Sequence, residues 1–564
     1  MSETVDAAAA AHALTRLRDE LAALGLGLET PGAARGRAMR DEIVAQVDDY
    51  LLPRLEQMEA PLLMVVGGST GAGKSTLVNS LVGAEVTAAG VLRPTTRAPV
   101  LACNPGDVRW FQDDRILPGL ARTTGGSAGP GGLQLVATEG LPAGVALLDA
   151  PDIDSVVEAN RALAGKLLAA ADSWLFVTTA ARYADAVPWD ALHAARDRGT
   201  SLSVVLDRVP PDAGGEVSAH LRQMLDDRGL GDTALLVVPE TPLERGLLPE
   251  GDLAPVRAWL DALAADAHER AGLVRRTLSG ALRSMPRRVG IVAEALAEQD
   301  QAAATLGAAV ESAYAEALDE VDETVRSGSL LRGEVLARWH DVVGTGDVMR
   351  AIETRVGWLR DRLRSVVTGR PTADAELRTA VETGVDAVVR AAADTAAERV
   401  SGRWRHEAAG RPLLAQVPRS DRASSGLPGA VADTVRDWQG HVFDLVRTEA
   451  ASKRTTARLA SLGLNGAGLT VMLAVFASTG GLTGAEVVVA GGTSALSQRL
   501  LEAIFGDQAV RTLAARARED LLGRVQRLFA AEARRFEAPL ASATPPAGAA
   551  GRLAEALRAL ERVG

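Results

Sequence analysis

The chain alternates between two hydrophobic rhythms over residues 62–270. Short apolar runs are separated, in most cases, by segments of ten or more residues in which apolar positions recur every three to four residues. The first rhythm is typical of buried strands and the second of amphipathic helices, so we expect a mostly parallel sheet with crossover helices. A Gly- and Pro-rich insert near 104–132 is expected to be a surface loop. The apolar runs are Leu62–Val66, Pro99–Cys103, Leu133–Thr138, Val145–Leu148, Trp174–Thr178, Leu202–Leu206 and Ala234–Val238.

Outside this region the pattern is helical. Residues 4–26 and 33–59 precede the sheet, and from residue 272 the strand signal stops and long Ala/Leu/Val/Arg/Glu segments follow. Alanine and leucine head the scale of helix propensity, so we expect an α/β domain followed by a long all-α stalk or bundle that carries an apolar hairpin. The expected domains are residues 1–60 (N-terminal helices), 61–270 (the α/β domain), 271–457 (the stalk), 458–498 (the hairpin) and 499–564 (helices that return to the stalk).

The hairpin is a stretch almost without charge. Between Leu459 and Ser497 the only formally charged residue is Glu486, and Leu459–Thr479 is long enough to cross about 30 Å of hydrocarbon as a helix. Gly480-Gly481 supplies a turn, and basic residues flank both ends of the stretch. This arrangement favours a hairpin whose two ends both lie at the cytoplasmic leaflet of the membrane. A buried helical pair inside a large bundle is the alternative. The flanking basic residues are Lys453, Arg454, Arg458 and Arg499.

Composition narrows the class of protein. The net charge of −11 and the pI near 5.4 argue against an obligate nucleic-acid binder, so no nucleic-acid partner is expected. The one cysteine, Cys103, excludes an internal disulfide and a multi-cysteine metal site. The N-terminus lacks the apolar core of a signal peptide, which predicts a cytoplasmic protein. Together with the hairpin, this predicts peripheral or integral association with the inner face of the cell membrane.

The strongest chemical signal follows the first apolar run. Residues Gly68 to Ser75 read G-x-x-x-x-G-K-S, preceded by the strand LLMVV and followed by the helix STLVNSLVG. The glycines let backbone N–H groups curl round phosphates, and Lys74 brings an ammonium to the outer phosphates of a nucleoside triphosphate. Only three of the 61 basic residues are lysines, so a lysine here is informative. The expected phosphate-binding residues are Gly68, Ser69, Thr70, Gly71, Ala72, Gly73, Lys74, Ser75 and Thr76.

A magnesium site is expected beside this loop. The Ser75 hydroxyl is placed to bind Mg²⁺, and the run Val145–Leu148 ends at Asp149, a carboxylate that a metal would balance at a buried strand end. In the segment VLRPTTRAPV, Thr96 is the first choice and Thr95 the second for a hydroxyl that reaches the metal; two exposed loop threonines are the alternative. The predicted metal ligands are therefore Ser75, Thr96 and Asp149, and the predicted catalytic residues are Lys74, Thr96 and Thr70.

The motifs GGSTGAGKST, RPTTR and LLDAPD resemble, in order and spacing, those of translation-factor-type GTPases and especially bacterial dynamin-like proteins. The match covers roughly residues 60–245. The resemblance implies a dynamin-like GTPase that binds GTP with Mg²⁺, contacts membrane lipid through its stalk tip, and remodels or tethers membrane after self-association or pairing with a related dynamin-like protein. Cell division is one process that this would fit.

The chain departs from that family in three places. Asp152 stands where the motif D-x-x-G has glycine, and it would repel a phosphate unless it turned away. The base-reading motif is replaced by Asp207, Arg208, Val209 and Pro210, so its final Asp is missing unless Asp212 or Asp207 substitutes. Asp207 and Arg208 are the expected base contacts, and guanine over adenine rests on the family alone. The dynamin Gln and Ser are here Thr70 and Gly71, and Ile153 stands where a Ras-like enzyme has its water-orienting Gln.

These departures predict slow or assembly-stimulated hydrolysis and leave two alternatives open. One is a soluble Era-like regulatory GTPase, against which the acidic balance and the apolar stretch count. The other is a nucleotide-binding scaffold with weak catalysis.

Overall fold

The computed structural model describes residues 7–87, 98–113, 116–117, 120–124, 132–155, 157–212, 214–326, 373–452 and 507–563. The chain divides into two compact units. The head unit comprises Met1–Leu26, Gly32–Ala297 and Pro545–Gly564, and the stalk unit comprises Gly27–Pro31 and Glu298–Thr544. The predicted fold class, an α/β domain with a long helical region, is confirmed.

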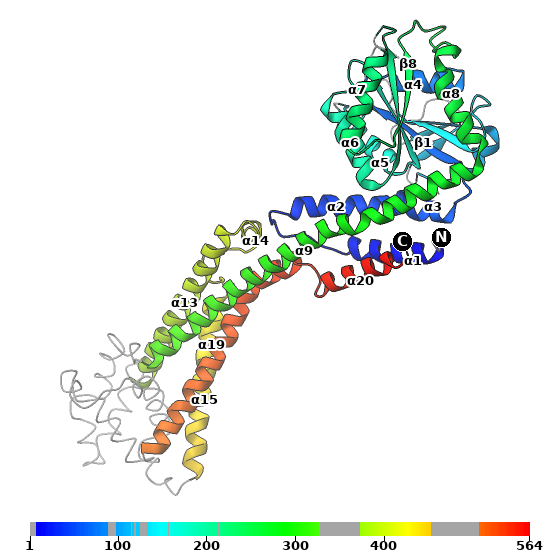
Figure 1. The fold of residues 1–564 in the computed structure, drawn as a ribbon. Coiled ribbons are helices and arrows are strands. Elements are labelled where there is room, and N and C mark those ends of the chain that lie inside the picture. Colours follow the sequence, from blue (N-terminus) through cyan, green and yellow to red (C-terminus); the bar gives the residue numbers. More distant parts are fainter. Residues whose placement is uncertain are drawn as a thin grey trace, which may run out of the picture. The chain divides into compact units, whose positions relative to one another are not determined.

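The head unit is built on an eight-stranded sheet in the order β3-β4-β2-β5-β1-β6-β7-β8. Figure 1 shows this sheet with helices packed around it. All neighbouring strands are parallel except β2 and β5, which run antiparallel. The parallel pairs bring the carboxyl ends of β5, β1, β6 and β7 to one edge, where ligands bind in sheets of this class. The strands are β1 (Leu62–Gly68), β2 (Val100–Cys103), β3 (Ala121–Thr123), β4 (Gly132–Ala137), β5 (Val145–Asp149), β6 (Ser173–Thr179), β7 (Ser201–Val209) and β8 (Ala234–Pro239).

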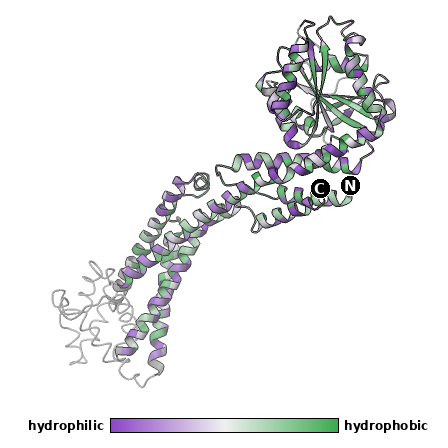
Figure 2. Ribbon diagram, in the orientation of Figure 1, coloured by the Kyte–Doolittle hydropathy of each residue, from purple (hydrophilic) through white to green (hydrophobic). Residues whose placement is uncertain are grey.

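Helices cover both faces of this sheet because the central strands are apolar on both faces; the strands are predominantly hydrophobic in Figure 2. Leu62, Met64 and Val66 of β1 pack with α4 and α8, whereas Leu63 and Val65 pack with α5 on the other face. On that second face α6 and α7 cover β6 and β7. These helices are α4 (Lys74–Val82), α5 (Glu158–Ala169), α6 (Ala186–Arg198), α7 (Gly214–Asp227) and α8 (Glu250–Ala265).

The insert near 104–132 is not a plain surface loop. Its described part contains a 3-10 helix, η2 (Pro105–Trp110), and the edge strand β3. Phe111 is 1% exposed and packs with Leu101 and Leu133, so the insert contributes to the core. Arg122 holds it together by donating to the carbonyls of Phe111, Leu117, Leu120 and Ile116.

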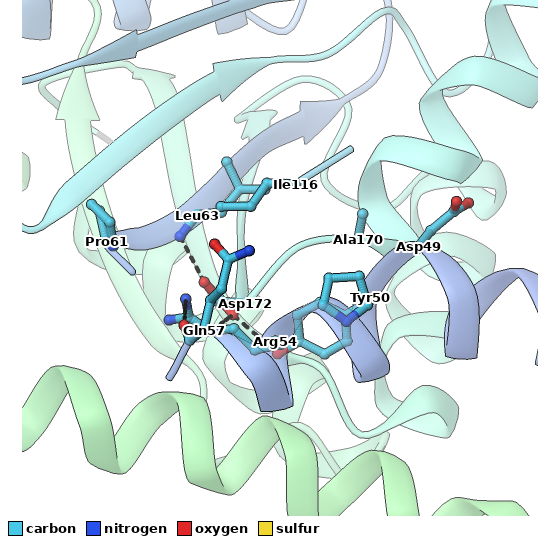
Figure 3. A pocket seen from close by; sticks show the side chains of 10 residues that line it. Asp49, Tyr50, Arg54, Gln57, Pro61, Leu63, Ile116, Ala170 and Asp172 are labelled. Atoms are coloured by element: carbon cyan, nitrogen blue, oxygen red, sulfur yellow. Dashed lines mark hydrogen bonds and ion pairs between the residues drawn. The ribbon is translucent and has the colours of Figure 1, made fainter. Parts of the chain in front are cut away.

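Four helical segments near the chain ends complete the head unit, together with the first part of α9. They share one hydrophobic core with β1 and α4. At the amino ends of β1 and β6 this core encloses a polar cluster around Asp172, shown in Figure 3. The segments are α1 (Ala7–Ala22), α2 (Ala33–Gln46) with the π-helical turn η1 (Val47–Leu51), α3 (Leu52–Glu56) and α20 (Ala549–Glu561); α9 spans Ala267–Arg326.

All described secondary-structure elements of the stalk unit are helices. The later part of α9 packs with α13 (Ala373–His406), α14 (Gly410–Leu414), α15 (Leu427–Ser452) and α19 (Asp507–Ala543) around one core. Two buried tryptophans join its helices, because Trp404 Nε1 donates to the Leu306 carbonyl over 3.1 Å and Trp438 Nε1 to the Ala517 carbonyl over 2.7 Å. The predicted hairpin, 458–498, lies outside the described residues. No described helix combines the length and the apolarity that a membrane crossing requires.

Candidate nucleotide-binding site

The turn between β1 and α4 is the loop predicted to hold phosphates. Gly68, Gly71 and Gly73 have φ angles of 152°, 76° and 94°, a region that glycine adopts without strain. A Cβ at Gly68 would collide with the carbonyl oxygen of Val177 on β6, and a Cβ at Gly73 would collide with the Asp207 carboxylate. Glycine at these positions therefore lets the loop curl tightly between strands, immediately before the N-terminus of α4.

Lys74, the first residue of α4, has only 4% of its side chain exposed. Its ammonium donates to the carbonyls of Gly68 and Ser69, both over 3.0 Å, and pairs with the carboxylate of Asp152. A buried ammonium is costly unless its donors are satisfied, and these three oxygens match its three donors. Asp152, at the position of the motif glycine, has thus turned toward the cation that a triphosphate is expected to bind.

Ser75 and Asp149 form the predicted metal pair. The Ser75 hydroxyl donates to Asp149 Oδ2 over 2.8 Å, and Asp149, the last residue of β5, is fully buried. Burial raises the pKa of Asp149 to about 6, against the opposing effects of Ser75, Lys74 and Thr87. Its other carboxylate oxygen, Oδ1, has no hydrogen-bond partner among the described residues.

These groups fit a magnesium ion. Mg²⁺ takes oxygen ligands and is usually held by one or two protein groups together with water and phosphate oxygens. Ser75 supplies a hydroxyl and Asp149 a carboxylate with one unpaired, buried oxygen. Within the described residues no group of three or more His, Cys, Asp and Glu is placed to hold a metal. An ion held by Ser75 and Asp149 would have coordination positions left for water and phosphate oxygens.

A further threonine lies at this metal pair. Asn79 on α4 accepts from the backbone N–H of Thr87 and donates to its carbonyl, both over 2.9 Å, and so fixes the chain that leaves the helix. The Thr87 side chain is buried close to Asp149 and acts to lower the pKa of that carboxyl, although its hydroxyl makes no hydrogen bond of ordinary geometry with a described residue. Thr96, the predicted metal ligand and catalytic residue, lies outside the described residues.

A network of charges holds the first turn of the loop. Asp154, in the segment after β5, accepts from the backbone N–H of Thr70 over 2.6 Å and from its hydroxyl over 2.7 Å. Arg182, in the turn after β6, donates to the Thr70 carbonyl over 2.7 Å and to Asp154 over 3.2 Å. Burial acts to raise the pKa of Asp154, but the Thr70 hydrogen bonds and the Arg182 charge outweigh it, so this pKa lies below its ordinary value. The predicted catalytic residue Thr70 is thus held in place by hydrogen bonds with Asp154 and Arg182.

Asp207 and Arg208, the expected base contacts, lie beside the loop near Gly73. The Asp207 side chain is 10% exposed, and its Oδ2 atom lies 3.7 Å from Arg208 Nε. Burial raises the pKa of Asp207, with partial offset from the backbone N–H and the charge of Arg208. Arg208 has a φ of 55°, unusual for a side chain of this size. Their contact with a base stays a prediction.

The structure brings the predicted residues Gly68–Thr76, Asp149, Asp207 and Arg208 to one edge of the sheet. Asp154, Arg182 and Thr87 join them there and were missed in the sequence. Asp154 and Arg182 each follow the carboxyl end of a strand next to β1, and this position is the signal that could have found them. The fold is that of a P-loop GTPase domain with a helical stalk.

Comparison with known proteins gives matches at the level of solved structures. The sequence matches no protein-family model and no curated protein. One similar structure is a bacterial dynamin pair described as sensing and tethering membranes at long range, with 10% identity over 93% of this chain and 94% of that chain and a TM-score of 0.39. Two others are Era GTPases with TM-scores of 0.24. Era of Aquifex aeolicus with GDP and aluminium fluoride is 15% identical over 36% of this chain and 56% of that chain. Era with MgGDPNP and a 16S ribosomal RNA segment is 16% identical over 37% of this chain and 57% of that chain.

The resemblance to bacterial dynamin-like proteins that the motifs predicted is found again among these structures. Because identities and TM-scores are low, the assignment of the fold rests on the strand order and the phosphate loop.

Proposed function

We propose that this protein is a dynamin-like, Mg²⁺-dependent nucleotide-binding protein that hydrolyses GTP slowly and associates with membrane. The observation that carries the nucleotide part is the convergence of three groups at the start of α4. Lys74 offers an ammonium, Ser75 a hydroxyl, and Asp149 a carboxylate with an unpaired oxygen, all beside a glycine loop. This is the combination that P-loop nucleotide hydrolases use for outer phosphates and magnesium.

The residues suggest how binding would proceed. Backbone N–H groups of the loop and the N-terminus of α4 would receive the phosphate oxygens. Lys74 would give up its ion pair with Asp152 and pair with the outer phosphates instead, and Ser75 with Asp149 would hold Mg²⁺. When bound, the ion neutralises charge on the β- and γ-phosphates. Ile153 occupies the place of a water-orienting side chain and is half-buried against the core, which favours slow turnover.

Titration of the purified full chain with non-hydrolysable GTP and ATP analogues, with and without Mg²⁺, tests this part. Lys74→Ala is expected to abolish binding, because it removes the buried cation. Lys166→Ala is a matched control, since Lys166 is 44% exposed on α5 and pairs only loosely with Asp49 at 3.7 Å. Equal affinities of wild type and Lys74→Ala would end the assignment. The ratio of the two wild-type affinities decides between guanine and adenine.

The membrane part of the proposal rests on the apolar hairpin and its basic flanks. Liposome flotation of the full chain with anionic lipid, compared with a variant lacking 459–497, tests it. Val471→Arg is expected to weaken flotation, because a charge at the membrane centre costs about 2.5–3.5 kcal/mol. Unchanged flotation of both variants would overturn membrane association through the hairpin. Tethering, remodelling, cell division and pairing with a related protein extend this same proposal.

A nucleotide-binding scaffold with little turnover is the second candidate, because Asp152 already pairs with Lys74. A single-turnover assay decides between them: a hydrolysis rate no higher than that of Lys74→Ala would favour the scaffold.

A further inference from the structure

Arg182 lies against the phosphate loop although it belongs to a different part of the chain. It sits in the turn between β6 and α6, and each of its three guanidinium nitrogens donates to a different acceptor. Nη1 donates to the Thr70 carbonyl over 2.7 Å, Nη2 to Asp154 over 3.2 Å, and Nε to Asp185 over 2.9 Å. One cation therefore joins the loop, the segment after β5 and the turn after β6.

The backbone of this turn is fixed, whereas the side chain is accessible. The N–H groups of Arg182 and Tyr183 both donate to the Thr179 carbonyl over 2.9 Å. The Tyr183 carbonyl in turn accepts from Trp189 Nε1 over 2.9 Å. The Arg182 side chain is 38% exposed, and that of its partner Asp185 is 45% exposed. The guanidinium can exchange partners without movement of the main chain.

The position of Arg182 corresponds to the outer-phosphate end of the loop. Its partner Asp154 lies two residues after Asp152, which occupies the motif position that meets the γ-phosphate in GTPases. Among the described residues, a second arginine near the loop is Arg208, which lies beside Gly73. Of the two, Arg182 is therefore the one placed for the phosphate that is transferred.

The negative charges near the loop favour a cation at this position. Asp149, Asp152 and Asp154 all face this region, and a triphosphate adds several negative charges. Hydrolysis moves further charge onto the phosphate oxygens, and P-loop hydrolases balance it with an arginine supplied by the same chain or by a partner. At the positions where the dynamin Gln and Ser and the Ras-like Gln are expected, this chain has Thr70, Gly71 and Ile153.

We propose that Arg182 is a catalytic arginine that leaves Asp154 and Asp185 when a nucleoside triphosphate binds and donates to its γ-phosphate oxygens. This inference rests on the proposed function. In the reaction a water oxygen bonds to the γ-phosphorus, the bond from that phosphorus to the bridging oxygen breaks, and its electron pair stays on the diphosphate. The water proton passes to the released phosphate, while Arg182 remains protonated throughout.

The test compares Arg182→Gln with Arg222→Gln in the full chain. Arg222 on α7 also donates to backbone carbonyls, those of Gly231 and Thr233, away from the loop. Arg182→Gln is expected to slow single-turnover hydrolysis about 10³-fold or more, with the dissociation constant for GDP within about threefold of wild type. It should also lose the tight complex with GDP and aluminium fluoride, which mimics the transition state. Arg222→Gln should match wild type in all three measurements.

Three outcomes would overturn the proposal. Hydrolysis by Arg182→Gln at the wild-type rate would exclude a catalytic role. Equal losses in GDP affinity and hydrolysis would show that Arg182 only shapes the loop. Asp185→Asn, which removes a partner but keeps the cation, should hydrolyse within about threefold of wild type; a loss as large as that of Arg182→Gln would assign the effect to the network. If wild type bound no nucleotide at all, the proposed function itself would fail.

Discussion

Two buried aspartates at opposite ends of the sheet show how a structural carboxylate differs from one poised for a ligand. Asp172, next to the amino end of β6, is 1% exposed, and Asp149, at the carboxyl end of β5, is fully buried. Burial raises the pKa of both. Both side chains contact an element that flanks the sheet, but their hydrogen-bonding differs.

Asp172 is saturated with partners. Its Oδ2 accepts from the backbone N–H of Leu63 over 2.7 Å, and its Oδ1 accepts from the Tyr50 hydroxyl over 3.1 Å and pairs with Arg54 Nε at 3.0 Å. Figure 3 shows these groups converging on the carboxylate. Asp149, by contrast, has Ser75 on one oxygen and no hydrogen-bond partner among the described residues on the other. A charge buried for stability is fully paired, whereas the Asp149 charge is left for an incoming cation.

The largest loss in the free energy of unfolding is expected from Asp172→Ala. The substitution leaves the Arg54 guanidinium, which is 7% exposed, without its buried partner, and breaking such a pair costs about 3–5 kcal/mol. Urea denaturation of the full chain measures this loss, and faster hydrogen exchange of the peptide that contains Leu63 places it in the head unit.

A double variant sharpens this prediction. Arg54→Met with Asp172→Asn removes both charges together and is expected to recover most of the stability, because neither charge is then left unpaired. Wild-type stability of Asp172→Ala, or a double variant weaker than Asp172→Ala, would contradict the idea of a saturated structural pair.

Asp149→Asn is expected to do the opposite and stabilise the nucleotide-free protein. A carboxyl group whose pKa rises from 3.8 to about 6 on folding favours the folded state when protonated, and that contribution is lost as the pH rises through about 6. Asparagine carries no charge to bury. The variant should therefore match wild type near pH 4 and exceed its free energy of unfolding by about 1–3 kcal/mol above about pH 7.

The same variant is expected to lose the dependence of nucleotide affinity on Mg²⁺, because the amide is a poorer ligand than the carboxylate. Urea denaturation at a series of pH values gives the first result, and nucleotide titration with and without Mg²⁺ gives the second. A variant less stable than wild type at pH 8 would show that Asp149, like Asp172, is structural.

Sequence reasoning predicted the parts of the head that depend on local pattern. Seven of the strands appeared as apolar runs, and the G-x-x-x-x-G-K-S motif located the loop because its chemistry lies in consecutive residues. The strand β3 was missed because it has three residues, too few for a period, inside a Gly- and Pro-rich insert. It is held in place by hydrogen bonds from its own Arg122 and by pairing with β4, and neither contact leaves a local pattern.

Contacts between distant residues were beyond the sequence. Arg182 and Thr70 are 112 positions apart, and Tyr50 and Asp172 are 122 apart. Each pair meets only once the strands are aligned in register. The charge of Asp152 was visible as a departure from the motif, yet its partner was not, because a carboxylate at that position can face either solvent or Lys74.

That partner supports a last, smaller prediction: Asp152→Asn should bind a triphosphate more tightly than wild type. In the present structure Lys74 is paired with Asp152, so a nucleotide must displace one carboxylate and then sit beside it. Removing that charge is expected to lower the dissociation constant about tenfold, equal to about 1.4 kcal/mol, and less at high salt because the repulsion is screened. Asp232→Asn changes an exposed carboxylate in the turn before β8, away from the phosphate loop, and serves as the control for net charge. If both variants bound like wild type, Asp152 would not compete for Lys74. Tighter binding by Asp152→Asn alone would show that an anionic group in the position of the motif glycine weakens phosphate binding. This competing pair of Asp152 and Lys74 lies at the opposite end of the sheet from the saturated pair of Asp172 and Arg54.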